Sequence, residues 1–223
     1  MNIASHGSHG SHGSHGSAGD MLARLAQADG SAAHPFVRRF SGLGATSTDL
    51  ADAVHALCAV HGRHPGMIEA ALAHCAQPEA CDWLERVAAG FAGERTALAL
   101  LIAAAGPLPS TPGQAESEAA LAGVRRAIEM LASSDRGGCA TGAAAALVED
   151  WRVVRSVMTA AAGRFAIVLA PCLLPNAADT GAALTALSGA PSVQRAVDFG
   201  ARQLLAQHRG FWDLMDARAA ARG

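Results

Sequence analysis

The chain has 223 residues, a formal net charge of −2 and 51% hydrophobic residues, mostly alanine and leucine, which favour α-helix. It has no basic stripe with interleaved aromatic residues, so we expect no nucleic-acid partner. No apolar run reaches the ~18 residues of a membrane-spanning helix, so we expect no membrane partner and a cytoplasmic location.

Residues 1–20 are set apart by a Ser-His-Gly repeat between Ser5 and Ser17, which offers nothing apolar to bury. We interpret 1–20 as a disordered expression tag, with a native metal-binding tail as the alternative. Residues 21–47 have mixed polarity and two glycines near their end, so we expect an irregular lead-in. Residues 48–223 are predicted to form a single helical bundle domain.

Helix boundaries follow from capping residues, prolines and glycines. They predict helices at about 48–61, 65–76, 79–105, 113–133, 138–162, 179–187 and 192–220. Four of these are long, which favours an all-α antiparallel four-helix bundle with extra short N-terminal helices. The short loops near Pro107 and Asp135 should each join antiparallel neighbours, and the connection 163–191 could cross from one end of the bundle to the other.

The five cysteines are odd in number and form no Cys-x-x-Cys pair. In a chain of this length that pattern predicts reduced thiols packed as small hydrophobic residues, as in a cytoplasmic protein.

Polar residues interrupt the apolar stripes of the long helices. At a spacing of three or four residues, Glu94 and His208 fall on the apolar faces of the predicted helices 79–105 and 192–220, and Asp150 lies at the core margin of 138–162. Glu118 and Arg125 flank the apolar stripe of the predicted helix 113–133. A buried carboxylate needs a partner. For Glu94 the candidates are His208, Arg125 or Arg126, Arg152, and a cation.

This pattern resembles the ferritin-like superfamily, in which carboxylates and histidines from four helices hold two metal ions. Gly93-Glu94-Arg95-Thr96-Ala97 resembles its first-helix segment, and the resemblance covers about 78–218. It implies Glu94, Asp150 and His208 as metal ligands, with iron or manganese as the metal. The family carries Glu-x-x-His on two helices, whereas Leu205 stands three before His208 here, so the site would be degenerate.

The chain also resembles a family of uncharacterised helical proteins from alphaproteobacteria, which brings no activity with it. The segments that carry this second resemblance are Pro109-Ser110-Thr111-Pro112-Gly113-Gln114, Ser134-Asp135-Arg136 and Gln207-His208-Arg209-Gly210.

Several other residue groups have two interpretations. His55, Cys58 and His61 form a secondary zinc candidate, or Cys58 is core and the histidines are surface or capping groups. The small residues after Gly138 either open a groove for a flat ligand or permit tight helix contact, which we favour. Trp212 is either covered by a second layer of helices or marks a dimer surface.

Two functions follow as hypotheses. The first is a binding or interaction protein of ferritin-like shape that needs no cofactor, forms a homodimer and takes a small-molecule ligand. The alternative is a metal-dependent oxidoreductase of the di-iron or manganese type, with Glu94, Glu118, Asp150 and His208 around the metals.

Overall fold

The computed structural model describes residues 18–40, 45–75, 77–187 and 189–222, and within them all regular structure is helical. This confirms the all-α class. The elements are α1 (Ala18–Asp29), the short 3₁₀ helix η1 (Ser31–Ala33), α2 (Pro35–Phe40), α3 (Ser47–His61), α4 (Met67–Ala73), α5 (Pro78–Ala105), α6 (Gln114–Ala132), α7 (Cys139–Arg164), α8 (Ala177–Ala186) and α9 (Pro191–Arg222).

Local signals in the sequence set the helix ends. The Thr46 side chain accepts a hydrogen bond from the Asp49 amide at the start of α3, and Asn176 caps α8 in the same way. Pro78 opens α5, and Gly106, with a φ of 78°, ends it. The predicted boundaries of the seven helices are therefore confirmed to within a few residues.

The lead-in at 21–47 is not irregular where the structure describes it. Leu22 and Leu25 of α1 are buried, as are Phe36 and Phe40 of α2. These residues are spaced three or four apart, so each short helix places one apolar side against the rest of the molecule. The prediction for this segment was wrong, and α1 also begins at Ala18, inside the predicted tag. Residues 1–17 lie outside the described residues.

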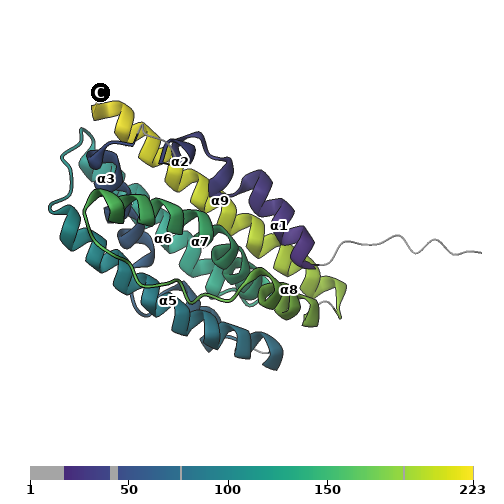
Figure 1. Ribbon diagram of the computed structural model, residues 1–223. Coiled ribbons are helices and arrows are strands. Elements are labelled where there is room, and N and C mark those ends of the chain that lie inside the picture. The colour runs from purple at the N-terminus through teal and green to yellow at the C-terminus, as the bar shows by residue number, and fades with distance from the viewer. Residues whose placement is uncertain (1–17, 41–44, 76, 188, 223) are drawn as a thin grey trace, which may run out of the picture.

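Helix α7 lies at the centre of the molecule (Figure 1). It contacts α9, α6, α3, α4, α5, α8 and α1. These helices surround it and contact one another, as α9 does α6 and α1, and as α5 does α4 and α8. A helix segment that is enclosed on all sides has to be apolar or small on all sides. This holds for the first half of α7, where every residue from Thr141 to Val148 is buried. The antiparallel ferritin-like arrangement of four helices stays a prediction.

The loop at Pro107 does not join neighbours, because α3 and α4 each pack between α5 and α6. The prediction for that loop was wrong. Helices α6 and α7, joined by the loop at Asp135, do contact each other as predicted. After Arg164 the chain leaves α7 and runs without helix along α5 to α8 at the other end of the molecule (Figure 1).

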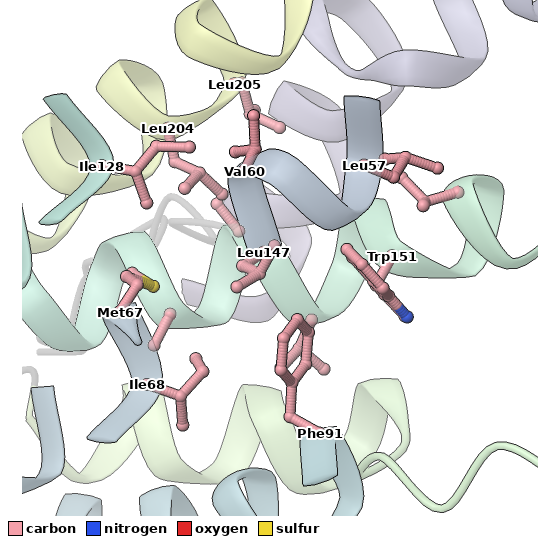
Figure 2. Close-up of a cluster of buried hydrophobic side chains, with 14 of the residues drawn as sticks. Leu57, Val60, Met67, Ile68, Phe91, Ile128, Leu147, Trp151, Leu204 and Leu205 are labelled. Carbon is pink, nitrogen blue, oxygen red and sulfur yellow. The ribbon is translucent and has the colours of Figure 1, made fainter. Parts of the chain in front are cut away.

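Apolar side chains from six helices meet around the middle of the molecule (Figure 2). The labelled residues come from α3, α4, α5, α6, α7 and α9, and they are Leu57, Val60, Met67, Ile68, Phe91, Ile128, Leu147, Trp151, Leu204 and Leu205. Trp212 is also fully buried, with Phe36 and Phe40 of α2 within 6.5 Å of it between ring centroids. A second layer of helices therefore covers Trp212, as one of the two interpretations proposed.

Helices α7 and α9 approach each other at glycines. A Cβ atom on Gly142 would lie 2.1 Å from the Val197 carbonyl oxygen, and one on Gly200 would lie 2.1 Å from the Cys139 carbonyl oxygen. Only glycine permits this separation. The small residues after Gly138 thus serve tight helix contact, which confirms the interpretation that we favoured.

Cys75 and Cys81 form a disulfide between the end of α4 and the first turn of α5. The prediction of five reduced thiols is wrong for this pair, while Cys58, Cys139 and Cys172 are free. The cytoplasmic location stays a prediction, without the argument from reduced cysteines.

Candidate functional site

A buried polar network surrounds the middle of α7. Its first part is centred on Asp150, whose carboxylate accepts hydrogen bonds from the Ser31 amide at 2.7 Å and the Ser31 hydroxyl at 2.5 Å. The His208 ring is joined to the same carboxylate through Nδ1 at 2.6 Å. Trp212 Nε1 donates to the Ser31 hydroxyl at 2.7 Å. The network therefore ties η1 and α9 to α7.

The charge at Asp150 is favoured by these contacts. Burial alone would raise the pKa of the Asp150 carboxyl, but hydrogen bonds and charge from His208, and hydrogen bonds from Ser31, lower it below its usual value. Asp150 is consequently a carboxylate inside the core, compensated by an imidazole and two donors.

The second part of the network is centred on Glu94 of α5. Trp151 Nε1 donates to its carboxylate at 2.9 Å, and Arg155 donates to both carboxylate oxygens at 2.7 Å. The other end of the Arg155 guanidinium donates to the Ala170 carbonyl. The prediction that Glu94 is buried with a partner is confirmed. The partners are Trp151 and Arg155, so the residues predicted as partners (His208, Arg125 or Arg126, and Arg152) were wrong.

His61 lies between the two parts. Its ring centroid is 5.2 Å from that of Trp151 and 5.1 Å from that of His208, with the rings edge to face. Burial, and secondly the charge of His208, hold the pKa of His61 well below its usual value of 6.5. His61 is thus a neutral imidazole in the core. Nε2 of His208 is buried and has no hydrogen-bond partner among the described residues.

The remaining predicted site residues do not join this network. Glu118 is exposed and accepts a hydrogen bond from Gln114 on its own helix. Arg125 donates to the Ala59 carbonyl at 3.3 Å and lies 3.7 Å from Glu129. The predicted four-helix cluster is therefore reduced to Glu94, Asp150 and His208, split between two separate groups.

The predicted zinc residues also separate. Nε2 of His55 is hydrogen-bonded to the Gly106 carbonyl at 2.9 Å, Cys58 is a half-buried free thiol, and His61 faces the core network. In the described part of the chain, no three His, Cys, Asp or Glu side chains converge as a metal site requires. Neither the Glu94, Asp150 and His208 set nor the His55, Cys58 and His61 set is brought together.

An Asp–His pair can act as an acid–base unit when a substrate reaches the free ring nitrogen. Here the side chains of Asp150 and His208 are 1% and 3% exposed, and that of Glu94 is 2% exposed. In the structure, these contacts join α5, α7, α9 and η1 and hold the segment after α7 at Ala170.

The polar network also shapes a surface. Arg155 holds the Ala170 carbonyl, and the backbone at Leu173 lies so close to Gly90 that a Cβ there would be 2.8 Å from the Leu173 oxygen. The segment after α7 is thereby fixed alongside α5. We call the exposed residues of α5 between 89 and 104, together with those of 166–173, the uncharged face. They are Ala89, Ala92, Gly93, Thr96, Ala99, Leu100, Ala103, Ala104, Ala166, Val168, Ala170, Pro171, Cys172 and Leu173.

Sequence reasoning missed several residues of these sites. Ser31 lies in a segment without apolar periodicity, and Arg155 lies beside the stripe on which Val154 and Val157 fall. It also missed a second buried ion pair, in which Arg218 donates to Asp52 at 2.7 Å. Asp52 falls among buried apolar residues of α3, a signal that the stripe analysis would have found if applied there.

Comparison with curated proteins found no match, and comparison with solved structures found none. The comparisons support neither the ferritin-like resemblance nor an alphaproteobacterial origin. A model of a family of unknown function, DUF6975, matches residues 26–223. The chain belongs to this family.

Proposed function

We propose that this protein is a helical interaction protein that forms a homodimer through the uncharged face. The observation that carries the proposal is that this face has no charged side chain. Within 89–104 the charged residues are Glu94 and Arg95, whose side chains are 2% and 10% exposed. Both turn inward to partners, so α5 between 89 and 104 presents only small and apolar groups to its outer side.

Large apolar side chains on the face support an interface. Val168 is 92% exposed, Leu173 77% and Leu100 52%. Single exposed apolar residues are normal on a protein surface, but a contiguous apolar patch is typical of an interaction site. The backbone of 166–173 is held by Arg155 at Ala170 and by close packing of Leu173 on Gly90, so this part of the face is preorganised for a partner.

The small residues favour a second copy of the chain as the partner. Alanine, glycine and threonine at the exposed positions of α5 let a second helix approach closely. The α5 part of the face is about 22 Å long, or roughly four helical turns. A face without charge has no repulsion against itself, so two copies related by a two-fold axis can bury it mutually.

Sedimentation velocity over a concentration series tests the proposal. The chain should sediment as a dimer, and Leu100→Glu with Val168→Glu should convert it to a monomer with unchanged circular dichroism. Met130→Glu is the matched control, because Met130 is 67% exposed on α6, away from the face. A monomer at every concentration, or dissociation by the control alone, would overturn the proposal.

The apolar character of α5 also suggests a membrane as the competing partner. Ala80–Ala105 has the length and mean hydropathy of a spanning helix, although 39% of its most apolar window is buried inside the molecule. Flotation with phospholipid vesicles distinguishes a membrane partner from a second copy of the chain. Binding to vesicles by a monomeric protein contradicts the homodimer, and no flotation of the dimer supports it.

Metal analysis of tag-free protein separates the interaction protein from a metal-dependent oxidoreductase. Iron or manganese in a fixed ratio to the chain, lost on chelation together with thermal stability, would support the oxidoreductase. Chelation that leaves the melting temperature and the dimer unchanged would support the interaction protein.

A further inference from the structure

A second surface lies on the other side of α7, where α6, α9 and the loop before α7 meet. Figure 1 shows α9 and α5 on opposite sides of α7. Two hollows flank the Phe199 side chain there, with volumes of about 410 Å³ and 340 Å³. Both are lined by Phe199 and Arg136. We call the two hollows together the Phe199 groove.

One end of the Phe199 groove is apolar. Ala127, Met130 and Leu131 of α6 form its wall together with Phe199. Met130 is 67% exposed and Phe199 is 41% exposed. Two large apolar side chains that are open to solvent on neighbouring helices offer the kind of anchor surface that dominates the energy of protein interfaces.

The other end of the groove is basic. The Arg136 guanidinium lies 5.2 Å from the centre of the Phe199 ring, and Arg195 lines the second hollow. Neither guanidinium has a carboxylate within 4.0 Å among the described residues, whereas Arg202, one turn beyond Phe199, is paired with Asp198 at 2.9 Å. Two positive charges are therefore free to meet acidic groups of a partner.

We propose that the Phe199 groove binds an amphipathic helix of a partner protein. Its apolar residues would lie against Met130 and Phe199, and its Asp or Glu residues would lie at the end of the groove with Arg136 and Arg195. The hollows follow α9 from Ser192 to Gln207, a length of about 22 Å, which matches a helix of about four turns with anchors at i, i+4 and i+7.

The openness of the groove favours a helix over a small apolar molecule. Sites for small molecules enclose most of the ligand surface, but both hollows open broadly to solvent. A fatty acid in the groove would leave much of its chain in water. An amphipathic helix covers the apolar side chains with its own polar outer face, so it fits an open groove.

A displayed library of helical peptides of about 15 residues, panned on the full chain, tests this proposal. We expect enriched peptides to carry acidic residues at one terminus and apolar residues at helical spacing. Fluorescence anisotropy with an enriched peptide should show about tenfold weaker binding or more to Phe199→Ala, and a similar loss for the double variant Arg136→Glu with Arg195→Glu. Added salt should weaken binding to the unmodified protein.

The charge of the peptide provides the decisive control. Replacing its acidic residues by lysine should abolish binding to the unmodified protein and restore binding to the Arg136→Glu, Arg195→Glu variant. Arg126→Glu changes an exposed arginine of α6 outside the groove and should leave binding unchanged. Three results would overturn the proposal: no acidic enrichment, binding that is indifferent to Phe199→Ala, or groove-dependent binding of palmitate without binding of any peptide.

Discussion

The two halves of α7 are held in the molecule by different chemistry. From Cys139 to Val148 the helix is built of small or apolar residues without charge, and its backbone approaches that of α9 at Gly142. From Asp150 to Arg155 it carries charged side chains that reach Ser31, His208 and Glu94. Small residues set how close the helices lie, and the polar residues set which segments lie beside them.

The largest expected effect is in the polar half. Asp150→Ala should lower the free energy of unfolding by about 4 kcal/mol, because it leaves His208 and the Ser31 donors buried without their acceptor. Urea denaturation measures the change. Asp198→Ala removes a surface carboxylate paired with Arg202 and should cost about 0.5 kcal/mol or less. If both variants lost the same free energy of unfolding, burial would not be what makes the Asp150–His208 pair more stabilising than the Asp198–Arg202 pair.

The small-residue half is tested by two glycines of α9. Gly200→Ala should cost about 3 kcal/mol, because its Cβ would meet backbone atoms of α7 and force the helices apart. Gly210→Ala places a Cβ where no atom lies within 4 Å, and should instead stabilise the protein by up to about 1 kcal/mol through helix propensity. Thermal unfolding followed by calorimetry measures both. A stabilising Gly200→Ala would contradict the close approach of α7 and α9.

The sequence was sufficient to place these two halves on one helix, since apolar periodicity locates α7 and its buried polar positions. Asp150 and His208 were recognised because a charged residue on a 3–4 apolar stripe stands out whatever its partner is. Tight helix contact at the start of α7 followed from its run of alanine and glycine, whereas its partner, α9, did not. Features that repeat along one helix can be predicted without knowing what packs against it.

The pairing of the polar residues could not be predicted in this way. Arg155 lies beside its apolar stripe, and its long side chain carries the charge inward to Glu94. Ser31 and Asp150 are 119 residues apart, and Ser31 lies in a segment with no helical period. Arg125 and Arg126 were wrong as neighbours of Glu94 because they assumed that α5 and α6 pack together, whereas α3 and α4 separate these helices.

A smaller effect is expected at Glu94. Glu94→Gln keeps acceptor capacity for Trp151 but loses the charge that compensates Arg155, so the free energy of unfolding should fall by about 2 kcal/mol. Since Arg155 also holds Ala170, limited proteolysis should cut 166–173 faster in this variant. Glu149→Gln alters a pair within α7 and should leave the cleavage rate unchanged. Unchanged cleavage in both would mean that the network does not hold this segment.

The last effect depends on pH and is expected at His61, between the two parts of the polar network. Its folded-state pKa lies below 6.5 because of burial and then of the His208 charge. As the pH falls below about 6.5, the unfolded chain binds a proton at this position and the folded chain does not. The free energy of unfolding should therefore fall with decreasing pH, by about 1.4 kcal/mol per pH unit for this one group.

His61→Phe isolates that contribution, because it keeps a ring against Trp151 and Phe91 and removes the titrating group. Its stability, measured by urea denaturation between pH 5 and 7, should depend less steeply on pH than that of the unmodified protein. His74→Gln changes an exposed histidine and should keep the original slope. An unchanged slope in His61→Phe would mean that the pKa of His61 is the same in the folded and the unfolded chain, which would contradict its burial as a neutral imidazole.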